Sequence, residues 1–356
     1  MDYLPTAITG IDTQESINDA WKCIYGITEP PKIWCGLNLQ WPKFDLPLNQ
    51  GTYIISWHTE YIDLEWLDQQ SSRVFPDKII CITDYPCDIS VYGKDNVECR
   101  VFDTLDRQIQ ILTQHHGLQT QILKPQYKLS SLSMRYTQYK KFITAYLLAN
   151  VPHAEMMLTW HRWIAKQDDC HDHPLNIPCL SELDYTSLSV KQLINWIDDS
   201  DNVNISPVHN GHWQVPAYIN CLINLTNESM HYSQTIRKDM SYLMPGPYLT
   251  EKTMKPLVSG RPFISVGQSR SCERLSRCGF SLNFGFDHDY DHDDGDLTRI
   301  DKIFSLIKQI KNQSMDVLFG ASLNACQSNL HWIANGDFTR HMVDINAESL
   351  YYLKNI

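Results

Sequence analysis

The sequence lacks the features of secreted and membrane-spanning proteins. No apolar run approaches the roughly 20 residues that a membrane-spanning helix needs. The first residues, MDYLPTAITG, have neither the basic part nor the apolar part of a secretion signal. We therefore expect a cytoplasmic chain with no membrane partner.

Regularly spaced cysteines and an excess of basic residues are also missing. The 11 cysteines follow no regular spacing, and Cys81, Cys99 and Cys221 lie within apolar runs. Such a set indicates reduced core residues, so we expect no disulfide partner. Acidic residues outnumber basic ones, and the formal net charge is −11. This balance argues against a protein that is held mainly by the phosphates of nucleic acid, although it leaves room for a local basic groove.

The chain of 356 residues, 43% of them hydrophobic, is long enough for two domains with separate cores. Continuous apolar runs at 53–57 and 78–83 are typical of buried parallel strands, and 101–102 is the expected end of a third strand. The apolar spacing over 102–114 predicts a helix. This alternation predicts an α/β domain of the doubly wound type over residues 1–124.

The remaining sequence predicts a second α/β domain over 125–330. It contains an amphipathic helix over 139–147, a polar insertion over about 165–215 and a strong helix over 297–310. Residues 217–225 and 263–266 are predicted strands, and 331–356 is a predicted helical tail.

One acid and two cations lie at the start of an expected helix after residue 248. Thr250 is of a type that caps helix N-termini, and Glu251 follows in the first turn, where the helix dipole favours a carboxylate. Lys252 and Lys255 are close enough in sequence to face one anion. The segment is therefore either an ordinary capped surface helix or a site for a phosphate-bearing ligand.

Tyr248, Thr250, Glu251 and Lys252 resemble the Tyr-x-Thr-Glu-Lys signature of the α1,3-fucosyltransferase family and of related phage-encoded glycosyltransferases. The resemblance is closest around 248–267 and covers 125–330 more diffusely. It implies a GT-B-like fold, in which two Rossmann-like domains face a central cleft. It also implies that Glu251 binds a ribose or sugar hydroxyl and that Lys252 neutralises the diphosphate of a nucleotide sugar.

Two further segments resemble donor-binding parts of these enzymes. Arg135 and Lys140, near the start of the amphipathic helix, match cationic positions of a segment in the phage relatives, whose prolines are absent here. Glu228 follows a predicted strand and resembles the Phe-Glu-Asn-Ser strand end of fucosyltransferases. The resemblance implies donor contacts for all three residues. A solvated basic helix start and a simple turn are the alternatives.

A transferase that inverts the sugar needs a base that takes the acceptor proton. His58 and Glu60 follow one predicted strand of the N-terminal domain, and Asp84 follows the next. Each is a candidate for the catalytic base. The alternative is that each is an ordinary polar residue of a solvated loop.

The acidic run 287–296 does not fit a calcium loop. If Gly295 takes the glycine position of an EF-hand, the first ligand positions fall on Tyr290 and His292. We therefore expect no metal site and a structural role at a helix start. The phage relatives have a Tyr-Asp…Asp…Arg pattern here, which is matched by Tyr290, Asp291, Asp296 and Arg299.

The resemblance implies a metal-independent, inverting glycosyltransferase that moves a sugar from a nucleotide sugar to a hydroxyl of an acceptor glycan. By analogy to the fucosyltransferases, the donor it suggests is a GDP-sugar. The nucleotide sugar is a co-substrate, and no other cofactor is expected. One alternative is a phage-type enzyme of the host cytoplasm that acts on a hydroxylated modified DNA base. Another is a catalytically inactive binding protein of the same fold.

Overall fold

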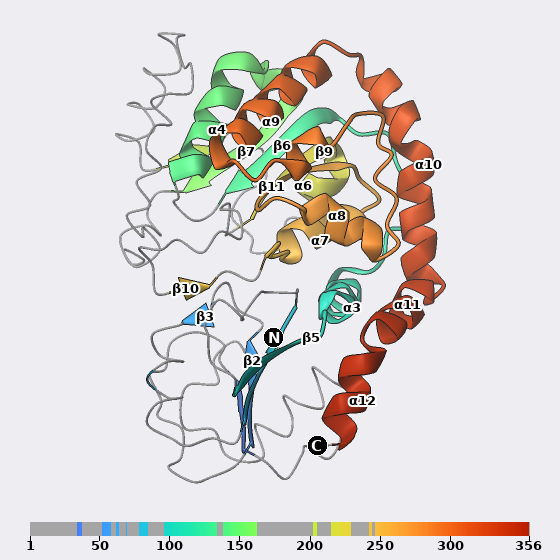
Figure 1. Ribbon diagram of the computed structural model, residues 1–356. Helices are drawn as coiled ribbons and strands as arrows, with labels where there is room; N and C mark the ends of the chain where they lie inside the picture. The colour runs from blue at the N-terminus through green and yellow to red at the C-terminus, as the bar shows by residue number, and fades with distance from the viewer. Residues whose placement is uncertain are drawn as a thin grey trace. The chain divides into compact units, whose positions relative to one another are not determined.

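In this computed structural model, the structure describes residues 34–37, 52–57, 62–63, 69, 78–84, 96–133, 138–161, 202–204, 215–228, 242–243 and 246–355. The fold is mixed α/β with largely parallel sheets, as predicted (Figure 1). No helix in these ranges is long and apolar enough to cross a bilayer. The cysteines with described side chains form no disulfide: Cys81, Cys99, Cys221, Cys272, Cys278 and Cys326.

The chain folds into two compact units. The first comprises residues 1–108, 233–248 and 338–356, and the second comprises 109–232 and 249–337. The predicted domain boundary after residue 124 falls inside the second unit. The final part of the predicted tail, from residue 338 onward, belongs to the first unit.

The first unit contains a parallel sheet of four strands in the order β1-β2-β4-β5. These strands are β1 (Trp34–Leu37), β2 (Thr52–Trp57), β4 (Lys78–Thr83) and β5 (Val97–Val101). A separate antiparallel pair joins β3 (Ile62–Asp63) to β10 (Tyr242–Leu243). Ile79, Ile80 and Ile82 of β4 have no exposed surface, as expected for an inner strand of a parallel sheet. The strands predicted at 53–57 and 78–83 are confirmed.

The last two helices of the chain are attached to the end of β5. Asn346 Nδ2 donates to the carbonyl of Asp103 at 2.9 Å, and its Oδ1 accepts from the N–H of Asp103 at 2.8 Å. Nearby, Arg100 pairs with Glu348 at 3.2 Å and covers the ring of Tyr352. These contacts explain why the C-terminal helices belong with the N-terminal sheet. The helices concerned are α3 (Leu105–His116), which crosses the unit boundary, α11 (Asp337–Ile345) and α12 (Ala347–Asn355).

The second unit contains a sheet of five strands in the order β11-β9-β6-β7-β8. They are β6 (Tyr127–Ser133), β7 (Met156–His161), β8 (Asn202–Asn204), β9 (Cys221–Asn227) and β11 (Phe263–Val266). All neighbours run parallel except β7 and β8. The chain leaves β6 for β7 on one side and later places β9 on the other side, so the connections reverse direction between β6 and β9. Open α/β sheets bind their ligands at such a switch point, beyond the carboxyl ends of the strands.

Helices cover the sheet of the second unit. α4 and α9 lie side by side (Figure 1), and the rings of Tyr146 and Phe304 stack with their centroids 3.8 Å apart. α7 packs against β9 and β11 and also contacts α10. The helices and 3-10 turns of this unit are α4 (Gln138–Asn150), η2 (His153–Glu155), α6 (Val215–Asn220), α7 (Glu251–Val258), α8 (Ser271–Arg277), η4 (Asp289–His292), α9 (Asp296–Lys311) and α10 (Met315–Ala334).

One predicted strand of the second unit is wrong in its first half. Residues 217–225 were expected to be extended, but α6 occupies the chain up to Asn220 and the strand begins at Cys221. Pro216 lies in the first turn of α6, where its missing N–H breaks no helical bond. Of the predicted insertion 165–215, only β8 and the first residue of α6 lie within the described residues.

Candidate functional site

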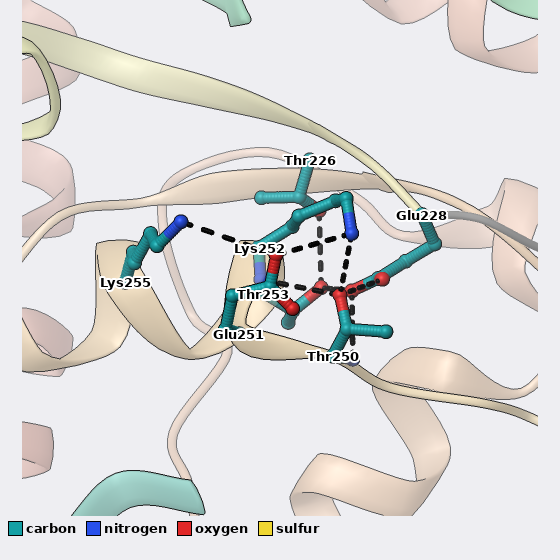
Figure 2. A network of polar contacts seen from close by, with 7 residues as sticks. All are labelled: Thr226, Glu228, Thr250, Glu251, Lys252, Thr253 and Lys255. Atoms are coloured by element: carbon teal, nitrogen blue, oxygen red, sulfur yellow. Dashed lines mark hydrogen bonds and ion pairs between the residues drawn. The ribbon is translucent and has the colours of Figure 1, made fainter. Parts of the chain in front are cut away.

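The candidate site is the start of α7, next to the carboxyl end of β9. β9 ends at Asn227, and Glu228 follows it directly, beside the switch point of the sheet. On the other side of β9, β11 ends at Val266, which pairs with Asn227. The first turn of α7 lies against this edge, and Figure 2 shows its polar side chains together with those of β9.

Thr250 caps α7, as predicted. It has an extended backbone, and its Oγ1 accepts a hydrogen bond from the backbone N–H of Lys252 at 3.2 Å. Glu251 then occupies the first turn, where its carboxylate faces the positive end of the helix dipole. The local sequence alone therefore accounts for the position at which α7 begins.

Glu228 forms hydrogen bonds with the first turn of α7. Its Oε1 accepts from the backbone N–H of Thr250 at 3.2 Å and from the hydroxyl of Thr253. Its Oε2 accepts from the hydroxyl of Thr250. Thr253 Oγ1 also lies 3.2 Å from Thr226 Oγ1 on β9, as the dashed lines in Figure 2 show. Glu228 has no exposed surface. The expected direct donor contact by Glu228 is therefore replaced, in this conformation, by a role in positioning α7.

The hydrogen bonds around Glu228 suit its ionised form. Thr250 Oγ1 accepts from both the N–H and the ammonium group of Lys252, so its own proton is free to be donated to Glu228. Burial raises the pKa of the Glu228 carboxyl above its usual value, and the charge of Lys252 and the two threonine hydroxyls offset only part of this effect. A buried carboxylate with several donors is stabilised only while those donors stay in place.

Lys252 and Lys255 meet at a single oxygen of Glu251. Lys252 Nζ is 3.2 Å from Glu251 Oε1, and Lys255 Nζ is 4.0 Å from the same oxygen. Lys252 Nζ also donates to Thr250 Oγ1 at 3.2 Å. The side chains of Glu251 and Lys252 are 43% and 27% exposed, whereas that of Lys255 is only 9% exposed. The two lysines thus face one anionic oxygen, as the sequence spacing predicts.

The charges of this group shift one another's pKa values. Partial burial acts to raise the pKa of Glu251, but Lys252 and Lys255 outweigh it and lower that pKa to about 2. Burial lowers the pKa of Lys255, and the charge of Glu251 offsets part of this effect. Glu251 is therefore a carboxylate at any physiological pH and a strong partner for both cations.

The acidic run after residue 286 serves helix starts, as predicted. Both carboxylate oxygens of Asp291 accept from the first N–H groups of α8, those of Cys272 at 2.9 Å and Glu273 at 3.0 Å. Arg299 Nε donates to the carbonyl of Gly267 at 3.0 Å, just after β11. Asp293 accepts from the N–H of Gly295 at 3.0 Å, at the start of α9. In the part of the chain that the structure describes, no group of His, Cys, Asp or Glu is arranged to hold a metal ion.

The remaining predicted site residues are not brought to the start of α7 by any described contact. His58, Glu60 and Arg135 lie outside the described residues. Lys140 is 3% exposed, within α4. Tyr248 is half-buried and belongs to the first unit.

Asp84, a predicted candidate for the catalytic base, supports a helix start. It is 7% exposed, and its Oδ1 accepts from the backbone N–H of Thr104 at 3.1 Å and from the Thr104 hydroxyl at 2.8 Å. Thr104 directly precedes α3, and its carbonyl accepts from the N–H groups of Arg107 and Gln108. The Asp84 carboxylate thus caps α3, and it is poorly placed to remove the proton from the hydroxyl of an acceptor substrate.

Sequence reasoning missed Thr226 and Thr253. Alternation along β9 puts Thr226 and Glu228 on the same face of the strand, and a three-residue spacing puts Thr250 and Thr253 on the same side of α7. These two periodicities in the sequence could have indicated that the side chains of each pair share a face. The meeting of the two faces, 22 residues apart in sequence, was not visible locally.

Comparisons of the chain with protein-family models, with curated proteins and with solved structures give no match. The resemblance to glycosyltransferases therefore rests on the motif residues.

Proposed function

We propose that the second unit binds the diphosphate of a nucleotide sugar at the start of α7, and that the protein is a glycosyltransferase of the GT-B type. The observation that carries the proposal is the convergence of Lys252 and Lys255 on one anionic oxygen at a helix N-terminus. This start lies at the carboxyl ends of the parallel strands β9 and β11, beside the switch point of the sheet. Helix N-termini and paired ammonium groups both favour phosphate oxygens.

The proposed reaction is a single displacement that inverts the anomeric centre. A base removes the proton of the acceptor hydroxyl, and the hydroxyl oxygen attacks the anomeric carbon. The bond from that carbon to the diphosphate breaks, and the diphosphate leaves with the electron pair. Lys252 stabilises the charge that develops on the leaving group, which is the step where preorganised cations contribute most. In this scheme a bound metal is not required.

The GT-B architecture that the resemblance implies takes the base from the N-terminal part of the chain. Because Asp84 is engaged with Thr104, His58 and Glu60 are the stronger candidates for this role. Glu251 would accept a hydrogen bond from a ribose or sugar hydroxyl. The nucleotide base and the sugar are left open, with a GDP-sugar favoured by the resemblance alone.

The structure weakens support for a DNA acceptor. That alternative depends on a local basic groove around Lys128, Arg135, Lys140 and Lys141, of which Arg135 and the side chain of Lys141 lie outside the described residues. Lys128 Nζ instead lies 2.7 Å from Glu155 and donates to the carbonyl of Lys311 at 3.1 Å, and Lys140 is buried. Neither ammonium group is therefore available to a DNA phosphate, and we favour a glycan or another small hydroxyl acceptor.

Ligand-induced thermal stabilisation tests the proposed donor site. GDP, UDP, ADP and CDP, each at millimolar concentration, are compared by their effect on the melting temperature. A ligand at one hundred times its Kd should add about 2.7 kcal/mol to the free energy of unfolding. Absence of a shift with all four nucleotides contradicts the donor site. Binding without any turnover of the matching nucleotide sugar would instead favour the inactive binding protein.

A further inference from the structure

We propose that Glu251 is an internal counter-ion for Lys252 and Lys255, and that an incoming diphosphate displaces it from both lysines. The proposal rests on the proposed function, because it describes how the same site exchanges one anion for another. It gives Glu251 a role in the ligand-free protein that the sequence motif does not suggest.

The geometry shows one oxygen between two cations. Glu251 Oε1 lies 3.2 Å from Lys252 Nζ and 4.0 Å from Lys255 Nζ (Figure 2). A phosphate oxygen makes the same charge-assisted contacts with ammonium groups as a carboxylate oxygen does. The position of Oε1 therefore marks the place that a phosphate oxygen would take, and the two anions compete for it.

The three side chains differ in their freedom to move. Lys255 is 9% exposed, and Lys252 Nζ is held by Thr250 Oγ1 at 3.2 Å. Glu251 is 43% exposed, so it can rotate into solvent while the lysines stay. Partly exposed ion pairs contribute little to stability, so the fold tolerates the loss of this pair.

The charges around the pair favour an exchange over simple addition. Glu228 remains in place, because it has no exposed surface and accepts from Thr250 and Thr253. Glu251 supplies one negative charge to two lysines, whereas a diphosphate supplies at least two. If Glu251 stayed in place, its carboxylate would repel the ligand at short range.

Substitution of Glu251 should therefore change ligand affinity in the opposite direction to substitution of a residue that only binds the ligand. Removal of the Glu251 charge should strengthen the binding of a bare diphosphate, since the ligand no longer competes with the Glu251 carboxylate for the two lysines. Inorganic pyrophosphate is the suitable probe, because it has no ribose or sugar hydroxyl with which Glu251 could form a hydrogen bond. Its affinity therefore reports on the lysines alone.

The test is calorimetric titration of the full chain with inorganic pyrophosphate. The variants are Glu251→Gln and Glu251→Ala, with Glu348→Gln as the matched control, because Glu348 is 86% exposed and pairs with Arg100 at 3.2 Å in the first unit. We expect both Glu251 variants to bind pyrophosphate about tenfold more tightly than wild type, which corresponds to about 1.4 kcal/mol. Glu348→Gln should leave the affinity unchanged, and the gain should vanish when Lys252→Ala is added to Glu251→Gln.

The counter-ion role is overturned if the Glu251 variants, shown to be folded by their melting curves, bind pyrophosphate as wild type does or more weakly. If wild type still binds a nucleoside diphosphate in that case, the proposed function stands and only the role of Glu251 fails. If neither wild type nor the variants bind pyrophosphate or any nucleoside diphosphate, both proposals fail.

Discussion

Glu228 and Thr250 are joined by two hydrogen bonds: the backbone N–H of Thr250 donates to one carboxylate oxygen at 3.2 Å, and its hydroxyl donates to the other. The two residues are 22 positions apart in sequence. The pair ties the carboxyl end of β9 to the first turn of α7. The position of Lys252, two residues after Thr250, therefore depends on a carboxylate with no exposed surface.

Glu228→Gln should destabilise the protein and weaken nucleotide binding together. The glutamine amide keeps one oxygen that can accept from the Thr250 N–H and the Thr253 hydroxyl, but its NH2 group then faces the Thr250 hydroxyl, which already accepts from Lys252. A buried donor without an acceptor costs about 1 to 3 kcal/mol. Chemical denaturation measures the free energy of unfolding, and titration with a nucleoside diphosphate measures affinity. Thr253→Ser, which keeps the hydroxyl, is the control and should retain affinity better than Thr253→Val. Full affinity in Glu228→Gln would argue against the positioning role.

Asp291→Ala should lower the free energy of unfolding, because Asp291 caps a helix and has no role in ligand binding in this proposal. The change leaves the N–H groups of Cys272 and Glu273 without their cap, and loss of a helix cap costs about 1 to 2 kcal/mol. Asp293→Ala is the matched control in the same acidic run. Asp293 is 21% exposed, so its loss should cost less than about 1 kcal/mol. Thermal unfolding of the two variants checks the order, and equal melting temperatures would contradict it.

Protonation of His288 should lower the free energy of unfolding in mild acid. Its Nε2 faces the carbonyl of Leu282 at 3.2 Å and therefore carries the proton, so Nδ1 accepts from the hydroxyl of Tyr290 at 3.0 Å. Burial lowers the pKa of His288 from 6.5 to about 4. The unfolded chain then binds this proton more readily than the folded one. The stabilisation by neutral His288 is complete above the unfolded pKa and is lost as pH falls through the folded value.

The matching measurement is the free energy of unfolding of wild type and His288→Gln between pH 7.5 and pH 4, values chosen to bracket this titration. A pKa shift of this size corresponds to about 3 kcal/mol. The pH dependence of the variant should be flatter than that of wild type by a sizeable part of this amount. Parallel curves would show that His288 does not titrate differently in the two states.

Chelation should not affect nucleotide binding or turnover. In the proposed reaction the ammonium groups of Lys252 and Lys255, and not a metal ion, stabilise the charge of the leaving diphosphate. Titration with the nucleoside diphosphate in EDTA and in Mg²⁺ is the measurement, with the same affinity expected in both. If EDTA abolished turnover and Mg²⁺ or Mn²⁺ restored it, the GT-B assignment would be withdrawn.

Local patterns in the sequence predict local structure well in this chain. The apolar runs gave β2 and β4, and Thr250 with Glu251 gave the start of α7, because strands and caps depend on neighbouring residues. Residues 217–225 misled, since an apolar run reads alike in a helix and in a buried strand. The run is divided between α6, which ends at Asn220, and β9, which begins at Cys221.

Long-range contacts escaped prediction for a physical reason. Asn346 binds Asp103 across 243 positions and so attaches the last helices to the first unit, which no periodicity in the sequence indicates. Glu228 was expected to touch a ligand, because a carboxylate at a strand end is typical of a binding site. Its burial under α7 depends on the packing of β9 against that helix.

Lys252→Ala is the sharpest test of whether Lys252 and Lys255 form a diphosphate site. Lys252 is 27% exposed, so its removal should leave the fold intact. We expect the variant to fold with a somewhat lower melting temperature, because the charge of Lys252 no longer offsets the burial of Glu228. It should bind the preferred nucleoside diphosphate at least tenfold more weakly than wild type. Its transfer rate should fall about a hundredfold, or about 3 kcal/mol. Calorimetric titration of a folded Lys252→Ala variant with wild-type affinity would contradict the account.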